Sequence, residues 1–269
     1  MCSGIDPKAN IDLIISAIDT AAKAGAAMLF TPEMSNIIDS NGRRALPLLA
    51  EEAHDDQLER LQSAAAGAGI WIHVGSMAFL SGQGDGRRVN RGLVIDNEGQ
   101  IRARYDKLHL FDVDLPTGER WRESASYLPG ARAIVAETLL GKLGLSICYD
   151  LRFPALYQAQ SAAGATVLAI PAAFTVPTGA AHWHVLVRAR AIENAAWVIA
   201  AAQNGSHEDG RHTYGHSLVI NPWGDVVLDM AQVNGLGFAE IDQDTVDDIR
   251  ARIPVIAHRQ RIPAVEITQ

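Results

Sequence analysis

Residues 142–150 read KLGLSICYD, a short and largely apolar run that turns polar after Cys148. An apolar run of this length between polar boundaries is typical of a strand that is buried on both faces of a sheet. A helical stretch follows at Ala155–Ala163, and a second apolar strand follows at Thr166–Ile170. Strand, helix and strand in this order indicate a layered α/β protein.

The same alternation extends outward along the chain in both directions. Asn97-Glu98-Gly99 is a turn signal that joins two of the strands into a hairpin, so the sheet should be mixed. No repeat and no linker interrupts the pattern, and residues 1–269 are therefore predicted to form a single domain. Helices are predicted at residues 7–28, 56–68, 155–163, 180–195 and 245–252, and strands at 28–30, 70–76, 89–96, 100–105, 142–148, 166–170, 196–202, 216–221, 226–230 and 237–241.

The composition excludes several classes of protein. With 48% hydrophobic and 20% charged residues, the chain of 269 residues is neither disordered nor fibrous. Its 23 basic and 31 acidic side chains give a net charge of −8, which argues against a nucleic-acid partner. No apolar stretch is long enough for a membrane helix. Two cysteines and a start without a signal peptide lead us to expect a cytoplasmic protein.

Cys148 is the first candidate for chemistry. It is predicted to end a strand just before a turn, where a nucleophile is exposed and where backbone N–H groups are free to bind a developing oxyanion. The alternative is a buried cysteine that only fills space, which is the commoner fate of a lone cysteine.

Two charged residues follow strands in a similar way. Glu33 comes directly after an apolar strand and could serve as a general base in a pocket of low dielectric constant; the alternative is a solvated loop glutamate. Lys107 continues the alternating run 101–105, which would place its ammonium group on the less polar face of the strand. There it needs an anion or a transient oxyanion, unless it is only a lysine that protects a sheet edge.

The histidines suggest a metal site, but their spacing is poor. His182 and His184 are two residues apart and so point to different faces of a helix. His212 and His216 are four apart, in a loop without an accompanying carboxylate motif. Solvated or hydrogen-bonded imidazoles are the simpler interpretation, and we predict no metal site.

Taken together, five motifs resemble those of the nitrilase superfamily of carbon–nitrogen hydrolases, and the resemblance extends over nearly the whole chain. The motifs are FTPE ending at Glu33, YDKLHLFDVD around Lys107, SICYDLRFP around Cys148, AHWHVLVRARAIEN from Ala181 and YGHSLVINPWG from Tyr214.

The resemblance implies a four-layer α-β-β-α sandwich that pairs across a two-fold axis, hence a homodimer or larger homo-oligomer. It also implies a triad in which Cys148 attacks the amide carbon, Glu33 moves the proton and Lys107 stabilises the oxyanion. The backbone N–H of Tyr149 would be the second oxyanion donor. Glu123 matches a further glutamate of the family that positions the substrate and the lysine. The expected reaction passes through a thioester, releases ammonia from a small amide and needs no metal or organic cofactor.

The residues after Cys148 resemble the Nit branch, which holds ω-amidases and deaminated glutathione amidases. In that branch Arg152 and Thr178, the latter within Phe174–Gly179, match positions that bind the substrate carboxylate. An ion pair between Arg152 and Asp150 or a neighbouring acid is the alternative for the arginine. The segment AAQNGSHEDGRHTYGHS is closer to the deaminated glutathione amidases. A nitrile or an N-carbamoyl substrate remains an alternative in the same fold, and a non-catalytic interaction protein is an alternative of another class.

Two positions depart from the family. The chain starts at Met1-Cys2-Ser3-Gly4 without the strand that usually precedes this segment, so a neighbouring strand should lack a partner. Ala155 stands where the family usually has glutamate, which puts a supporting hydrogen bond near the cysteine turn in doubt. The tail after Ile253 would, by the resemblance, pack across a subunit interface.

Overall fold

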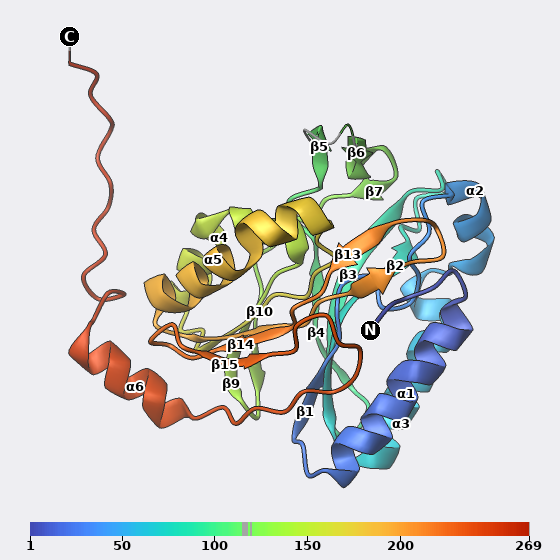
Figure 1. Ribbon diagram of the computed structural model, residues 1–269, viewed down its shortest axis with the longest axis horizontal. Helices are drawn as coiled ribbons and strands as arrows, with labels where there is room; N and C mark the ends of the chain where they lie inside the picture. Colours follow the sequence, from blue (N-terminus) through green and yellow to red (C-terminus); the bar gives the residue numbers. More distant parts are fainter. Residues whose placement is uncertain (115–117, 119, 269) are drawn as a thin grey trace.

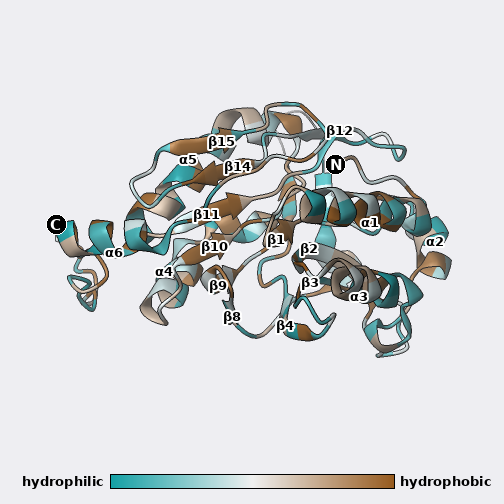
Figure 2. Ribbon diagram, turned by 90° about the horizontal axis from the view of Figure 1, so that it is seen from below, coloured by the Kyte–Doolittle hydropathy of each residue, from teal (hydrophilic) through white to brown (hydrophobic). Residues whose placement is uncertain are grey.

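Two mixed β-sheets are packed face to face at the centre of the protein, and helices cover their outer faces (Figure 1). The computed structural model describes residues 1–114, 118 and 120–268. From one side to the other the layers are α1 with α3, the first sheet, the second sheet, and α4 with α5 (Figure 2). This order confirms the predicted four-layer α-β-β-α sandwich.

The first sheet has the strand order β1-β2-β3-β4, and β7 pairs with β3 as well. Only β1 with β2 and β3 with β7 run parallel. β1 lies at the edge of this sheet, with β2 as its one neighbour among the described strands. The elements of this half are α1 (Pro7–Lys23), β1 (Met28–Phe30), α2 (Gly42–Ala45), α3 (Asp56–Ala68), β2 (Trp71–Leu80), β3 (Arg88–Ile95), β4 (Ile101–Asp106) and β7 (Tyr127–Leu128).

The second sheet has the order β15-β14-β11-β10-β9-β8. Its central strand β10 runs parallel to both neighbours and is buried throughout, which explains the unbroken apolar run in the sequence. The elements are β8 (Val135–Thr138), β9 (Gly141–Leu145), α4 (Pro154–Ala162), β10 (Val167–Ala169), α5 (Val176–Asn194), β11 (Trp197–Ala200), β14 (Leu218–Ile220), β15 (Val226–Asp229) and α6 (Gln243–Arg252).

Two small hairpins and four short 3-10 helices complete the described structure. The hairpin β5–β6 projects from the body, as Figure 1 shows. Beyond α6 the chain extends away from the body to the C-terminus (Figure 1). The hairpins are β5 (Asp112–Asp114) with β6 (Arg120–Arg122) and β12 (Asn204–Ser206) with β13 (His212–Tyr214); the 3-10 helices are η1 (Leu46–Leu48), η2 (Glu52–His54), η3 (Glu123–Ala125) and η4 (Cys148–Arg152).

The helix ends follow from local chemistry. The side chain of Asp55 accepts a hydrogen bond from the N–H of Leu58 and so caps α3, which ends at Gly69 in the left-handed conformation (φ 66°). α1 begins in the same way, with Asp6 as its cap and Pro7 in its first turn. The apolar stripe of α1 then faces the first sheet and buries Ile11 and Ile18 completely.

The two sheets approach closely beside the loop that follows β1. At Gly75 of β2 an added Cβ would lie 2.0 Å from the carbonyl oxygen of Thr31 and 2.5 Å from Cβ of Pro171. Only glycine fits there, because any side chain would clash with both of these atoms. Pro171 belongs to the second sheet's side of the interface, so the glycine lets the two sheets approach each other. Tyr105 of β4 and Leu145 of β9 are both buried in the core between the sheets.

Several details of the sequence prediction are wrong; for example, α1 ends at Lys23 instead of Met28, and α5 begins at Val176 instead of Ala180. The segment 237–241 forms no strand among the described residues; it is irregular and has no ladder partner there, and Phe238 is 53% exposed although Ile241 packs against the core. β9 ends at Leu145, and Cys148 begins the 3-10 helix η4 instead of ending the strand. β2 continues to Leu80, four residues beyond the predicted end. Among the described helices, none combines the length and the apolar character that crossing a bilayer requires.

Candidate active site

Glu33, Lys107, Glu123 and Cys148 all line one cavity of about 430 Å³. Glu33 follows β1 and Lys107 follows β4, both in the first sheet, whereas Cys148 follows β9 of the second sheet. The cavity therefore lies where the two sheets meet, and residues that are 115 positions apart in sequence (33 and 148) contribute to one wall. The sequence predicted this set, and the structure brings it together.

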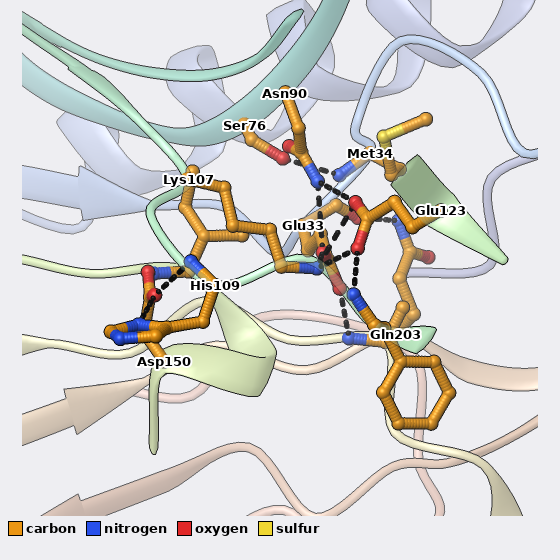
Figure 3. A network of polar contacts seen from close by, with 12 residues as sticks. Glu33, Met34, Ser76, Asn90, Lys107, His109, Glu123, Asp150 and Gln203 are labelled. Carbon is orange, nitrogen blue, oxygen red and sulfur yellow. Dashed lines mark hydrogen bonds and ion pairs between the residues drawn. The ribbon is translucent and has the colours of Figure 1, made fainter. Parts of the chain in front are cut away.

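Lys107 lies between two carboxylates. Its Nζ donates to Oε1 of Glu33 at 2.8 Å and to Oε2 of Glu123 at 2.9 Å, as Figure 3 shows. The lysine side chain is 2% exposed, so the alternative interpretation, a lysine that only protects a sheet edge, does not apply. Such a buried cation is stable only with anionic partners, and the two glutamates supply them.

Glu33 is fixed by backbone contacts. Its Oε2 accepts a hydrogen bond from the N–H of Ala173 at 3.0 Å, and its own carbonyl oxygen accepts one from Gln203 at 3.0 Å. The next residue, Met34, has a positive φ of 56°, and its N–H donates to Oγ of Ser76. Glu33 is 4% exposed and is therefore not the solvated loop acid of the alternative interpretation.

Asn90 of β3 is a site residue that the sequence analysis missed. Its Nδ2 donates to Glu33 at 3.0 Å and to Glu123 at 3.3 Å, so it bridges the two carboxylates on the side away from the backbone (Figure 3). No motif identifies Asn90, because an asparagine inside a predicted strand looks like an ordinary interruption of the apolar pattern. Its partners Glu33 and Glu123 lie on other elements, after β1 and in η3, so they could only be found in the folded protein.

Cys148 has a strained backbone. Its φ is 48°, an uncommon value for a residue other than glycine, and its N–H donates to the carbonyl oxygen of Pro171 at 2.8 Å. The turn is held by Asp150, which is fully buried and accepts hydrogen bonds from the N–H of Ile147, the hydroxyl of Tyr105 and the N–H of His109. These bonds hold the thiol at the cavity.

The protonation of the pair follows from burial and charge. Burial raises the pKa of the Cys148 thiol well above its usual range, and the nearby negative charge of Glu33 raises it further. Burial alone would lower the pKa of Lys107, but the charges of Glu123 and Glu33 outweigh it and raise the pKa well above its usual range. At neutral pH the resting site therefore holds a thiol and an ammonium group, and attack requires that the thiol proton be removed.

The backbone N–H of Tyr149 is available for an oxyanion. It is the second residue of η4, where N–H groups have no acceptor within the helix, and the described residues provide no other acceptor for it. The Lys107 ammonium group and this N–H are the two donors that the sequence resemblance implies.

Phe174 and Thr178 line the cavity. The hydroxyl groups of Thr178 and Thr175 lie 2.8 Å apart, and Gly179 allows the ring of Tyr214 to pack where a Cβ would lie 2.2 Å from the ring. Arg152 stands over the Phe174 ring at 5.4 Å and its Nη1 lies 3.3 Å from Nδ1 of His182, but it is not itself a lining residue.

The alternative for Arg152, an ion pair with Asp150, does not form, because the carboxylate of Asp150 is directed toward Ile147, Tyr105 and His109. Ala155 lies exposed in the first turn of α4. The alanine side chain offers no hydrogen bond, and the cysteine turn is held by the hydrogen bonds of Asp150.

Four arginines that the sequence analysis missed also line the cavity: Arg88, Arg120, Arg122 and Arg211. Arg88 of β3 is 7% exposed and stacks on the ring of Tyr127, and among the described residues it has no carboxylate partner. Its Nε is buried without a hydrogen-bond acceptor from the described part of the chain, and the same holds for Nε of Arg211. Arg211 is half-buried and pairs with Asp209 at 3.2 Å, whereas Arg88 is buried at the cavity wall with a free donor and is therefore suited to bind an anion.

The chain is similar to proteins that are named as carbon–nitrogen hydrolases, amidases or members of the nitrilase superfamily. The family model for Carbon-nitrogen hydrolase matches residues 2–251. "Deaminated glutathione amidase" of Yersinia enterocolitica is 37% identical over 98% of this chain and 92% of its own length. The crystal structure of the Caenorhabditis elegans NitFhit protein has a TM-score of 0.90 at 40% identity and covers 97% of this chain and 63% of its own. Saccharomyces cerevisiae Nit3, a member of branch 10 of the nitrilase superfamily, has a TM-score of 0.84 at 26% identity, with 94% and 91% covered.

Proposed function

The chain belongs to the carbon–nitrogen hydrolase family, and from that premise we propose that it hydrolyses a small carboxylated amide through a thioester on Cys148. The observation that supports the chemistry is the shared cavity with Cys148, Glu33 and Lys107 on its wall. The observation that supports the carboxylated substrate is Arg88, a buried cation whose described neighbours leave a donor free.

In the first half-reaction Glu33 takes the proton of the Cys148 thiol while the sulfur attacks the amide carbon. The carbonyl oxygen becomes an oxyanion, which the Lys107 ammonium group and the N–H of Tyr149 stabilise. Glu33 then gives its proton to the departing nitrogen, the C–N bond breaks and a thioester remains. The raised pKa of the thiol fits this sequence, because the nucleophile is formed only as the proton moves to Glu33.

In the second half-reaction Glu33 removes a proton from a water molecule that attacks the thioester. The same two donors hold the second oxyanion, and the sulfur leaves as a thiol by taking the proton back from Glu33. Lys107 stays charged throughout, since Glu123 and Glu33 keep its pKa high. Glu123 acts by holding Lys107 in place, and it does not attack the substrate.

The cavity suits a substrate with more than one anionic end. Thr178, Phe174, Arg88 and Arg211 all line it, and Arg152 lies just outside, over the Phe174 ring. Deaminated glutathione, which carries a carboxylate at each end, fits such a cavity better than α-ketoglutaramate, which carries one. The ω-amidase activity on α-ketoglutaramate or succinamate is the second candidate.

These two substrates can be told apart by their products. Both yield 2-oxoglutarate, because the same acyl group is transferred to Cys148. α-Ketoglutaramate is a primary amide and releases ammonia, whereas deaminated glutathione releases the amine of a dipeptide. The experiment measures 2-oxoglutarate from each substrate, with the Cys148→Ala variant as the background.

We expect turnover of deaminated glutathione with the higher kcat/KM and complete loss in Cys148→Ala, whose circular dichroism spectrum should be unchanged. Arg88→Gln should raise KM for deaminated glutathione at least tenfold and leave kcat largely intact. Arg87→Gln is the matched control, because the neighbouring Arg87 is exposed and paired with Asp85. Equal turnover in Cys148→Ala would refute the mechanism, and an unchanged KM in Arg88→Gln would refute the anion site.

A neutral amide tests the carboxylate separately. Succinamate and butanamide have similar length, and only the first carries a charge. If Arg88 binds the carboxylate, Arg88→Gln narrows the difference in kcat/KM between these two amides. Hydrolysis of an aliphatic nitrile or an N-carbamoyl amino acid in preference to all the amides would instead favour the alternative substrates.

We also propose that the protein is a homodimer in the cytoplasm, with the tail of each subunit against its partner. Val185 and Ile192 lie seven positions apart on α5, are 70% and 49% exposed and share one face of the helix. Ile262 and Val265 of the extended tail are exposed as well. Sedimentation should give twice the chain mass, and Val185→Asp should shift it toward the monomer; a monomeric parent protein would contradict the proposal.

A further inference from the structure

His184, His216 and Asp229 converge outside the cavity. Their ligand atoms lie within 4.8 Å of one another, and they come from α5, from the loop before β14 and from the end of β15. Nε2 of His184 lies 3.1 Å from Oδ2 of Asp229, and Nδ1 of His216 lies 2.9 Å from Oδ1. Neighbouring ligand atoms of a tetrahedral zinc site are separated by about 3.3 Å, so these spacings need little adjustment.

The three side chains are held in place by their surroundings. His216 adopts a positive φ of 55°, its carbonyl oxygen accepts a hydrogen bond from Nε1 of Trp183, and its ring stacks on Tyr214 at 4.6 Å. The Tyr214 ring also meets the His184 ring edge-on. Oδ1 of Asp229 accepts a hydrogen bond from the N–H of Ala231 at 2.7 Å, and this bond fixes the carboxylate. Fixed rings and an oriented carboxylate are what a metal site requires from its surroundings.

We propose that His184, His216 and Asp229 form a binding site for a divalent transition-metal ion of the Zn²⁺ type. Two imidazoles and one carboxylate match the ligand preference of Zn²⁺, and three protein ligands leave a fourth position for water. The site is accessible, since the side chains of His184 and Asp229 are 35% and 32% exposed.

The ion would join α5 to the edge of the second sheet. His184 lies on α5, while β14 and β15 are the last two strands of that sheet (Figure 1). Trp183, next to His184, packs its ring against Phe174 at 4.9 Å, and Phe174 lines the catalytic cavity. The ion is therefore a structural element that holds one wall of the cavity, and it takes no part in the acyl transfer.

A plain hydrogen-bonded network is the competing interpretation. Both imidazoles can donate to Asp229 without any ion, and the distances also fit hydrogen bonds. Metal binding and hydrogen bonding differ in one respect: an asparagine in place of Asp229 can still accept a hydrogen bond, whereas it is a far weaker ligand for Zn²⁺.

The test uses tag-free protein in a Cys2→Ala/Cys148→Ala background, so that neither of the two cysteines binds the metal. After treatment with EDTA and buffer exchange, Zn²⁺ is titrated by calorimetry and Co²⁺ by visible absorption. The variants are His184→Ala and Asp229→Asn, and His182→Ala is the matched control on the same helix. His216→Asn is the fourth variant, because asparagine tolerates a positive φ.

We expect one Zn²⁺ per chain, tetrahedral Co²⁺ absorption and a higher Tm in the presence of Zn²⁺. The affinity should fall by at least about 100-fold in His184→Ala, Asp229→Asn and His216→Asn and should not change in His182→Ala. Affinity that is equal in Asp229→Asn and in the parent, or the absence of stoichiometric binding in the parent, would overturn the proposal in favour of the hydrogen-bonded network.

Discussion

Lys107 and Asn90 both donate hydrogen bonds to Glu33 and Glu123, and Lys107 is the one cation of this group. One buried ammonium group faces Glu33 and Glu123, both of which contact its Nζ within 3.0 Å. Removing the lysine leaves two acidic groups close together without a cation. Breaking a buried ion pair from one side costs about 3–5 kcal/mol, much of it from the unpaired charge that remains.

Lys107→Met should therefore lose both stability and activity. We expect kcat to fall by roughly 10²–10³-fold or more, since one oxyanion donor is gone, and the free energy of unfolding to fall by about 3 kcal/mol. The double variant Lys107→Met/Glu123→Gln should recover part of the stability and none of the activity. Urea unfolding and steady-state kinetics measure the two separately, and recovery of activity in the double variant would contradict the assigned role.

The raised pKa of Cys148 gives a second prediction at this scale. Alkylation by iodoacetamide needs the thiolate, so labelling should be slow at neutral pH and should still be rising in the alkaline range. Slow labelling at neutral pH is thus compatible with a working nucleophile and does not by itself indicate a non-catalytic protein.

Glu33→Gln removes the charge that raises the pKa of the thiol. Labelling of Cys148 should therefore become faster at pH 7 to 8, even though turnover is lost with the general base. A Cys2→Ala background leaves Cys148 as the one reactive thiol, and mass spectrometry reports the rate. Labelling that is equally slow in Glu33→Gln would mean that Glu33 does not act on the thiol.

At the scale of elements, the accuracy of the sequence prediction depended on local signals. α3 is found at the predicted bounds, 56–68, because Asp55 and Gly69 mark its two ends through their own backbone contacts. The segment 237–241 alternates like a strand but has no neighbouring strand to pair with, and no local pattern reveals a missing neighbour. Motifs could identify the catalytic candidates because each motif is a contiguous stretch of sequence.

Residues that act across elements could not be predicted in this way. Arg88 precedes a predicted strand in a glycine-rich stretch and looks like an exposed loop arginine. His184 was paired with His182 by spacing, whereas the fold places it beside His216 and Asp229, 32 and 45 positions away. Such contacts depend on how α5 crosses the second sheet, and this is a property of packing.

Alanine substitutions at two helix glycines test how these helices pack. Gly67 of α3 is exposed, and a Cβ there would meet nothing within 4 Å, so Gly67→Ala should stabilise the protein by about 0.5–1 kcal/mol. Gly179 of α5 touches the Tyr214 ring, so Gly179→Ala should cost about 1–3 kcal/mol and raise KM as the cavity wall shifts. Thermal unfolding and kinetics of both variants check this, and equal effects would show that α5 does not pack as described.

For the whole molecule, we expect stability to fall in acid, and a buried histidine contributes to this fall. His73 of β2 is 1% exposed, and burial lowers its pKa to about 3. An unfolded chain binds a proton at this residue below about pH 6.5 and the folded chain does not. Stability is therefore lost as the pH falls from about 6.5 toward 3, by about 1.4 kcal/mol per unit from this group.

His73→Gln should flatten the dependence of stability on pH between 7 and 5. Urea unfolding of the parent and the variant at several pH values gives the two slopes, and the exposed His54→Gln serves as the control. The parent should lose about 2 kcal/mol more than His73→Gln over this range. Parallel slopes would show that another group is responsible.

The meeting of the two sheets at the cavity also determines when function arises. The acid, the amide bridge and the cation come from the first half of the chain, and the nucleophile comes from the second. A half-length ancestor or fragment would carry a base without a sulfur, or a sulfur without a base. During refolding, turnover cannot return before the halves have docked. Enzymatic activity is thus a direct readout of tertiary assembly.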